Sequence, residues 1–390
     1  MRVSRIGMFT YSTQPRGSVV HAACLAEALA RRGHDVTLFA LSKGGSRFFR
    51  ELACRVQLIP AAEAPAEMDA LIAQRIAELA AGLSALAPAL DVLHAQDCLV
   101  ASGLLEARKS SPTLAASPLV RTVHHVERFE SPYLAECQRR SVLSADVVLS
   151  VSRATQDDVW RSFERKSETV DNGVDIARFE GALTRPRAEA LRALGAADSA
   201  RLVLSVGGVE PRKNSRRCLS AMARVCSELP DATWVIAGGA TVLDHRAYRD
   251  AFDADLAALP AAIQRRIVRT GTLGEHELTE LYRFAQVLLG ASAHEGFGLS
   301  VLEGMAAALP VVVPRRPPFT DYVPPHVAQF VDPTSASDIA SAVLELLRNP
   351  TRAAELGRLG ADVARSFSWE RSADQHAAVY ARALASRAPA

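Results

Sequence analysis

The sequence predicts an α/β protein built from two doubly wound parallel sheets, and three observations lead to this prediction. Short apolar runs, of the kind that is buried on both faces of a sheet, alternate with longer helix-like segments. This alternation starts again near residue 200. The chain has 390 residues, 49% of them hydrophobic, which is more than one core normally contains. We therefore expect two domains.

The first half of the chain opens on a predicted strand, IGMFTY. The segment after it, VVHAACLAEALARRG, predicts a helix that ends at Gly33. The later strands of this half are DVTLFAL, CRVQLIP, DVLHAQ, LVRTVH and DVVLSVS. Helical patterns lie between them, and in residues 68–86 the apolar side chains recur on one face. Such a face usually packs on its own sheet, although it could also bind a partner.

The second half repeats the pattern after a polar, Ala/Arg-rich segment without strand character, which we interpret as a linker over residues 178–198. RRCLSAMARVCSEL predicts a helix. The predicted strands are RLVLSVGG, ATWVIAGG, RRIVRTG, VLLGAS and LPVVVP. Strands separated by helices predict a parallel sheet here too.

Composition excludes several classes of function. Formal net charge is +2 and neither half is a basic block, which argues against nucleic acid as the main partner. Six dispersed cysteines without a C-x-x-C pair predict reduced thiols rather than a disulfide framework or a metal knuckle. No stretch approaches a signal peptide or the roughly 20 apolar residues of a membrane span. We expect a cytoplasmic protein, and peripheral contact with the inner face of a membrane stays open.

Ligands of open parallel sheets bind where strands end and the next helix presents free N–H groups. In TYSTQPRGSVVH, Gly17 and Ser18 stand at such a turn, although a glycine turn is also common scaffolding. In SVGGVEPRKNS, Arg212 and Lys213 precede a helix. Cations at a helix N-terminus oppose its dipole and cost about 0.3–1 kcal/mol. A bound anion gives a reason for this pair, and the alternative is a solvated basic pair.

The segment HEGFGLSVLEG carries two carboxylates, Glu295 and Glu303, separated by seven residues. A continuous helix would separate them by about 12 Å along its axis. The bend at 296–298 instead allows Glu295 to stay in a loop, while Glu303 lies on the next helix. The N–H groups of Gly298, Leu299 and Ser300 are then free to meet a phosphate. This arrangement fits a ligand with an anionic centre and two polar ends, such as a nucleotide-sugar. The alternative for Glu303 is an exposed helical glutamate.

Together these segments resemble a family-4 glycosyltransferase of the GT-B architecture. The resemblance rests on the E-x7-E spacing in EGFGLSVLEGMA, with support from DNGVDIARF, GGVEPRKN, GEHELTELYRFAQVLLGAS and FSWERSADQHAAVYARAL. It covers nearly the whole chain. It implies two Rossmann-like domains that face each other across a cleft. The first is an acceptor-side domain (1–185) and the second is a nucleotide-sugar domain (186–366). A C-terminal helix (367–390) would return to the first domain.

The resemblance also implies a hexosyltransferase that is retaining, uses a nucleotide-diphosphate sugar, and needs neither metal nor cofactor. Its catalytic residues would be His124, Glu295, Arg212 and Lys213. Its donor-binding residues would be Gly17, Ser18, Leu273, Phe297, Gly298, Leu299, Ser300 and Glu303. Glu303 would bind the ribose, Arg212 and Lys213 the diphosphate, and Glu295 the sugar. His125 follows His124, so either could be the histidine that contacts the sugar.

Three departures from the family pattern put the identity of the donor in question. Gly208 stands where the family often has arginine, Gly17-Ser18 stands in place of the glycine pair of the first loop, and PPFTDYV replaces a glycine-rich loop. Prolines cannot donate amides, so the sugar contacts there must differ. The acceptor could be a glycan, a lipid or a small molecule. Alternative functions are a nucleotide-sugar epimerase on the same fold and a non-catalytic nucleotide-sugar-binding protein. A nicotinamide-dependent oxidoreductase is disfavoured, because the first turn lacks G-x-G-x-x-G.

Overall fold

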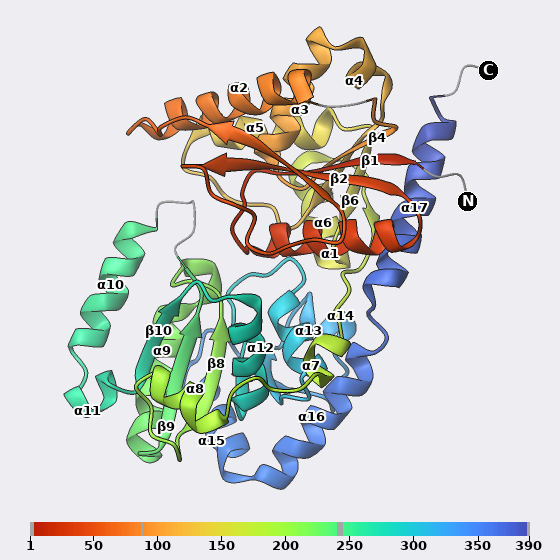
Figure 1. Ribbon diagram of the computed structural model, residues 1–390. Coiled ribbons are helices and arrows are strands. Elements are labelled where there is room, and N and C mark those ends of the chain that lie inside the picture. The colour runs from red at the N-terminus through yellow and green to blue at the C-terminus, as the bar shows by residue number, and fades with distance from the viewer. Residues whose placement is uncertain (1–3, 87–88, 240–244, 388–390) are drawn as a thin grey trace. The chain divides into compact units, whose positions relative to one another are not determined.

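The computed structural model describes residues 4–86, 89–239 and 245–387, and the chain forms two compact units (Figure 1). Unit 1 comprises Met1–Gly173 and Trp369–Ala390, and unit 2 comprises Val174–Ser368. The domain limits drawn from the sequence, after residues 185 and 366, stay a prediction about how the chain divides.

Unit 1 contains a seven-stranded sheet whose paired strands run parallel, in the order β3-β2-β1-β4-β5-β6-β7. Its strands are β1 (Arg5–Thr10), β2 (Asp35–Lys43), β3 (Arg55–Ala61), β4 (Val92–Ala95), β5 (Leu119–Val123), β6 (Val147–Ser150) and β7 (Glu168–Thr169). Its helices are α1 (Gly17–Arg31), α2 (Met68–Leu86), α3 (Cys98–Ser110), α4 (Pro112–Ala116), α5 (Pro132–Leu143), α6 (Arg153–Phe163) and α17 (Trp369–Ala385).

The central strands of unit 1 explain why the sequence folds this way. Every residue of β4 and β5 is buried, as expected for strands covered on both faces by helices. The helices that follow begin at polar caps: Asp97 caps α3, Ser131 caps α5 and Ser152 caps α6, each accepting a backbone N–H through its side chain. The strands therefore end sharply, and the turns after them lie at one edge of the sheet.

The predicted return of the last helix to the first domain is confirmed. Helix α17 belongs to unit 1 and packs against α1. Two ion pairs join them: Arg31 to Glu370 at 2.9 Å, and Arg32 to Asp374 at 2.7 Å. All four side chains are substantially exposed, so the buried apolar contacts contribute more to this packing than the ion pairs do.

Unit 2 contains a six-stranded parallel sheet in the order β10-β9-β8-β11-β12-β13. Its strands are β8 (Arg201–Val206), β9 (Ala232–Ala237), β10 (Ile267–Gly271), β11 (Val287–Leu289), β12 (Val311–Pro314) and β13 (Gln329–Val331). Its helices are α7 (Ala177–Glu180), α8 (Arg187–Ala193), the 3-10 turn η1 (Pro211–Lys213), α9 (Ser215–Glu228), α10 (Arg246–Ala257), α11 (Ala261–Gln264), α12 (Glu275–Phe284), α13 (Leu299–Ala306), α14 (Phe319–Tyr322), α15 (Ala336–Arg348) and α16 (Pro350–Ala364).

The two doubly wound sheets predicted from the alternation of strands and helices are confirmed. In each sheet the strand order reverses once, between β1 and β4 in unit 1 and between β8 and β11 in unit 2. Ligands of such sheets bind beside the carboxyl ends of the strands at this reversal. The structure adds two edge strands that the sequence did not predict, β7 and β13, and the short helices α7 and α8 inside the segment interpreted as a linker.

Candidate functional site

The strand-order reversal of unit 2 brings together two loops, one after β8 and one after β11. The loop after β8 carries η1, with Arg212 and Lys213. The backbone carbonyl of Arg212 accepts hydrogen bonds from the N–H groups of Ala293 (2.8 Å) and His294 (3.2 Å) in the other loop. Asn214, in a left-handed conformation, donates from its side chain to the carbonyl of Ala291 at 3.1 Å. These bonds fix the basic pair beside Glu295.

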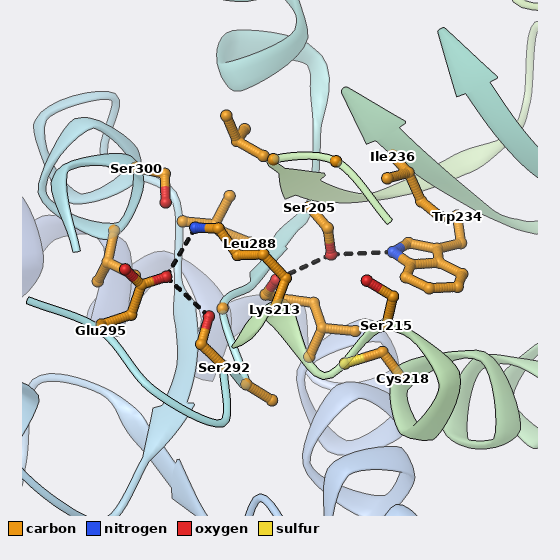
Figure 2. A pocket seen from close by; sticks show the side chains of 17 residues that line it. Ser205, Lys213, Ser215, Cys218, Trp234, Ile236, Leu288, Ser292, Glu295 and Ser300 are labelled. Atoms are coloured by element: carbon orange, nitrogen blue, oxygen red, sulfur yellow. Dashed lines mark hydrogen bonds and ion pairs between the residues drawn. The ribbon is translucent and has the colours of Figure 1, made fainter. Parts of the chain in front are cut away.

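A network of charged side chains occupies the junction of these loops. Arg212 Nη1 donates to Glu295 Oε2 at 2.7 Å, and Lys213 Nζ donates to Glu295 Oε1, also at 2.7 Å. Ser292 Oγ donates to the same Oε1 at 2.9 Å (Figure 2). The other Nη of Arg212 binds Glu210 at 2.8 Å. We call Arg212, Lys213 and Glu295 the ion cluster.

The ion cluster determines the charge of Glu295, whose side chain is only 9% exposed. Burial alone would raise the pKa of this carboxyl group. Arg212 and Lys213, with hydrogen bonds from Lys213 and Ser292, outweigh burial and lower the pKa to about 2. Glu295 is therefore an anion at any physiological pH, and it partly neutralises the two cations that the sequence assigns to a bound anion.

A glycine makes room for Lys213. Gly207 follows β8 with φ of 130°, and a Cβ there would lie 2.7 Å from Lys213 Cε. Any side chain at this position would displace the lysine. Lys213 and Glu295 also line a pocket, together with Ser205, Ser292 and Ser300 (Figure 2).

The start of α13 offers backbone donors beside the ion cluster. Gly298 adopts φ of 92° as the N-cap of this helix, which has no side-chain cap and no acidic residue in its first turn. Among the described residues, no hydrogen bond uses the N–H groups of Gly298, Leu299 or Ser300. Free N–H groups at a helix N-terminus attract anions. Ser300 also lines the pocket that Lys213 and Glu295 share.

Glu303, on α13, has different neighbours from Glu295. Its Oε1 accepts from Arg178 Nη1 at 3.0 Å, and its Oε2 accepts from the Tyr282 hydroxyl at 2.8 Å. The side chain is 14% exposed. Tyr282 is fully buried, and burial together with the Glu303 charge raises its pKa well above the usual value. The interpretation of Glu303 as a freely exposed helical glutamate is therefore wrong.

An aromatic cluster packs behind the bend at Gly296–Gly298. Phe297 is buried and stacks on Tyr322, with ring centroids 4.9 Å apart and planes within 1°. Phe367 contacts both rings. The Tyr322 hydroxyl is buried and has no hydrogen-bond partner among the described residues. Tyr322 comes from the proline-containing segment that departs from the family pattern.

His124 follows β5 at the carboxyl edge of the unit 1 sheet. Its Nε2–H donates to Gln96 Oε1 at 2.9 Å, and its ring lies edge-on to that of His21 at 4.8 Å. His125 instead contacts Glu127, with 3.1 Å between His125 Nε2 and Glu127 Oε2. Burial, with neighbouring cationic groups, lowers the pKa of His124 well below its usual value, so this imidazole is neutral.

His124 belongs to a group of four histidines that we call the histidine cluster: His21, His94, His124 and His376. Burial lowers the pKa of His21 to about 3 and that of His376 to about 4. His21 Nδ1–H donates to Asn172 Oδ1 at 2.7 Å, and His94 Nδ1 lies 2.7 Å from the Tyr380 hydroxyl. The Nε2 atoms of His21 and His376 have no partner.

The structure thus brings some predicted residues together and leaves others apart. Lys213, Glu295 and Ser300 line one pocket, and Arg212 pairs with Glu295 beside it. Gly298 and Leu299 precede Ser300 at the start of α13, and Glu303 lies about one turn farther along that helix. Leu273 is half-buried between β10 and α12 and does not line the pocket. Gly17 and Ser18 begin α1, and His124 follows the end of β5; all three residues lie in unit 1. Sequence reasoning missed Tyr282, Arg178 and the other three histidines.

Two further features bear on the chemistry of the described part of the chain. Within the residues that the structure describes, no group of three or more His, Cys, Asp or Glu side chains is arranged to hold a metal ion. No helix in those ranges combines the length and apolar character needed to cross a bilayer.

Two family models match the chain. The model "Glycosyl transferases group 1" matches residues 186–362, and the model "Glycosyltransferase Family 4" matches residues 15–178. Two characterised relatives are similar over almost the whole chain. MMP alpha-(1->4)-mannosyltransferase of Mycolicibacterium hassiacum is 26% identical over 98% of this chain and 98% of its own. D-inositol 3-phosphate glycosyltransferase of Acidothermus cellulolyticus is 29% identical over 98% and 91%.

Solved structures share the fold. Sucrose-phosphate synthase of Thermosynechococcus elongatus superposes with a TM-score of 0.78 at 20% identity, covering 98% of this chain and all of that one. The Anabaena protein Alr3699/HepE, in complex with UDP-glucose, superposes with a TM-score of 0.75 at 18% identity, covering 97% and 100%.

Proposed function

The chain belongs to the group 1 and family 4 glycosyltransferases, which use nucleotide-sugar donors, and on that premise we propose a specific reaction for it. It transfers a hexosyl group from a nucleotide-diphosphate sugar to an acceptor hydroxyl, with retention at the anomeric carbon and without a metal ion. The ion cluster beside the free amides of α13 is the observation that carries this proposal.

In the proposed reaction Arg212 and Lys213 bind the diphosphate. Without ligand their charge is directed at Glu295, at 2.7 Å from each of its oxygens. A diphosphate carries more negative charge than one carboxylate, so it competes for the same donors and also accepts from the N–H groups of Leu299 and Ser300. The charge that develops on the leaving group is then stabilised by groups already in place, which is usually the largest catalytic contribution.

The two glutamates take separate roles in this proposal. Glu303, held by Arg178 and Tyr282, keeps a fixed orientation in which its remaining lone pairs accept from the ribose hydroxyls. Glu295 contacts the transferred sugar. His124, as a neutral imidazole, is the further sugar-contacting residue of this proposal, and Gly17, Ser18, Phe297 and Leu273 complete the donor-binding set.

The surroundings of Glu295 argue against a covalent glycosyl-enzyme as the route to the proposed retention. A carboxylate engaged by two cations and a serine hydroxyl is a poor nucleophile, because its lone pairs are occupied and its pKa is about 2. We therefore favour attack of the acceptor on the face from which the diphosphate leaves, with the departing phosphate accepting the proton. The relative from Mycolicibacterium hassiacum is named as forming an alpha linkage.

The direct experiment uses a panel of nucleotide-diphosphate sugars. Native mass spectrometry of the full chain identifies the bound donor, and NMR of the product then reads the anomeric configuration. We expect one donor to bind, the product to keep the donor's configuration, and turnover to persist in EDTA. An inverted product would refute retention, and activity lost in EDTA and restored by magnesium would refute the role of the two cations.

The same experiment separates the remaining alternatives. A nucleotide-sugar epimerase would convert the donor in the absence of any acceptor, and its product would still carry the nucleotide. A non-catalytic binding protein would bind the donor and release neither nucleotide nor transferred sugar. Release of nucleoside diphosphate that depends on an added acceptor excludes both.

A further inference from the structure

The loops after β1 and β2 form a second concentration of charge, in unit 1. These strands are parallel neighbours, so their loops emerge side by side at the carboxyl edge of the sheet (Figure 1). Residues 11–18 and 43–50 contain four basic residues and no Asp or Glu. The four are Arg16, Lys43, Arg47 and Arg50.

Hydrogen bonds between the two loops make them one surface. The hydroxyls of Thr13 and Ser46 lie 2.9 Å apart, and the N–H of Phe49 donates to the carbonyl of Thr13 at 3.0 Å. Lys43 and Arg47 are exposed on this surface, and the glycines at 44 and 45, both with positive φ, leave the space beside Lys43 open.

Tyr11 holds two of the cations without neutralising them. Lys43 Nζ lies 5.0 Å from the centre of its ring, and Arg16 Nη1 donates to its hydroxyl at 2.8 Å. The N–H of Tyr11 is in turn held by Asp97 at 3.0 Å. A ring orients a cation while leaving its full charge, whereas a carboxylate cancels it. The arrangement therefore positions positive charge and keeps it available.

Three carboxylates near these loops are already engaged, and a fourth, Glu51, directly follows Arg50 and is exposed. Glu27 pairs with Arg50 at 2.6 Å, and Glu78 pairs with Arg75 at 2.7 Å. Asp97 accepts from the N–H groups of Tyr11 and Val100. No carboxylate among the described residues forms an ion pair with Lys43 or Arg47. Partial desolvation lowers the pKa of Lys43, and the positive charges of Arg16 and Arg75 lower it further, while Asp97 and Glu78 act in the opposite direction.

The N-terminus of α1 adds to the same surface. Arg16 is its N-cap, no side chain caps it, and its first turn has no acidic residue. At Gly17 nothing lies within 4 Å of where a Cβ would be, and among the described residues no hydrogen bond uses the N–H of Gly17 or Ser18. Cations at a helix N-terminus oppose the dipole unless an anion lies between them.

We propose that Arg16, Lys43 and Arg47, which we call the cation patch, bind a phosphomonoester carried by the acceptor. This inference rests on the proposed function, because it names the class of acceptor for that reaction. Two exposed cations and a helix N-terminus fit a compact dianion, whose oxygens accept from several donors at once. The phosphomonoester could belong to a soluble sugar phosphate or to a lipid headgroup, and the recognition chemistry is the same.

The test measures binding of phosphate to the full chain without a donor. The probe is glucose 6-phosphate, followed by broadening of its phosphorus NMR signal, with glucose as the uncharged comparison. Lipid-borne phosphate is tested by sedimentation with phosphatidylcholine vesicles that do or do not contain phosphatidic acid. The variants are Lys43→Ala and Arg47→Ala, singly and together. Lys166→Ala is the matched control, since Lys166 is exposed in unit 1, has no carboxylate partner and precedes β7, away from this edge.

We expect the double variant to lose at least tenfold in affinity for whichever phosphate source binds, and Lys166→Ala to lose less than twofold. Binding should persist in Lys213→Ala, which separates the cation patch from the ion cluster. No binding to either source, equal loss in the control, or loss only in Lys213→Ala would overturn the inference. Turnover of a nucleotide-sugar is a separate measurement, so failure of the proposed function is seen independently.

Discussion

The carboxyl edges of the two sheets differ in the charge state of their buried polar side chains: the histidine cluster in unit 1 is neutral, and Glu295 in unit 2 is ionised. In unit 1, burial lowers the pKa values of the histidine cluster, so four imidazoles stay neutral. In unit 2, Glu295 is just as enclosed, but Arg212 and Lys213 keep it ionised. A neutral ring can donate from one nitrogen and accept at the other, which suits sugar hydroxyls. A charged network suits a diphosphate. The comparison suggests that the two edges bind different parts of the reactants.

The largest expected effect comes from removing one cation of the ion cluster. Lys213→Ala leaves Glu295 paired with Arg212 alone and removes a donor to the leaving group. Loss of one preorganised donor of this kind typically costs about 10²–10³ in turnover. Steady-state kinetics should give that decrease, while Arg217→Ala, an exposed arginine on α9 outside the cluster, should stay within about threefold. A decrease of less than tenfold for Lys213→Ala would show that the ion cluster does not stabilise the leaving group.

The two glutamates sharpen the comparison within unit 2. Glu303→Ala should weaken binding of the free nucleoside diphosphate by about 1–3 kcal/mol, because charge-assisted hydrogen bonds to the ribose are lost. Glu295→Ala should not weaken that affinity, because it removes the carboxylate that competes with the diphosphate for Arg212 and Lys213. It should lower turnover, because the contact of Glu295 with the sugar strengthens in the transition state. Calorimetry and kinetics on both variants read these effects. The reverse pattern would exchange the two roles.

The sequence predicted the parts of this comparison that are local in the chain. Alternating strands and helices indicated both sheets, and the Gly-rich bend indicated that Glu295 and Glu303 lie in different environments. The partners of Glu303 could not be predicted. Arg178 and Tyr282 lie in the segments DNGVDIARF and GEHELTELYRFAQVLLGAS, but they are 125 and 21 positions from Glu303, and nothing in those segments shows that their side chains meet it. The histidine cluster draws on positions 21, 94, 124 and 376, which only the folded topology brings together. Strands β7 and β13 have two and three residues, too few for a periodic pattern.

The neutral histidine cluster of unit 1 leads to a prediction of how the free energy of unfolding depends on pH. The pKa of His376 is about 4 when folded and about 6.5 in an unfolded chain. The unfolded state therefore binds more protons below pH 6.5, so stability is complete above that pH and falls as the pH drops toward 4. Each such histidine contributes a slope of up to about 1.4 kcal/mol per pH unit. Between pH 6.5 and 5 most carboxylates are ionised in both states and add little.

Urea unfolding at pH 7 and pH 5.5 measures this slope. His376→Gln keeps a polar side chain but cannot titrate. The free energy of unfolding should therefore depend less steeply on pH, by up to the contribution of one histidine. His326→Gln, at an exposed histidine in unit 2, should leave the slope unchanged. Identical slopes for wild type and His376→Gln would mean that His376 is not held neutral by burial.

The last prediction compares two buried tyrosines of unit 2, one whose hydroxyl has a hydrogen-bond partner and one whose hydroxyl has none among the described residues. The Tyr322 hydroxyl is buried without such a partner, while the Tyr282 hydroxyl donates to Glu303 at 2.8 Å. A buried hydroxyl without a partner costs free energy, so Tyr322→Phe should raise the free energy of unfolding by up to about 1 kcal/mol. Tyr282→Phe should lower it by about 1–3 kcal/mol, because it leaves a buried carboxylate with one partner fewer. Denaturant unfolding of both variants gives the two signs directly. If Tyr322→Phe destabilised the protein, its hydroxyl would have to be bonded, and the aromatic cluster behind the bend would not be the dry packing that Phe297 and Phe367 indicate.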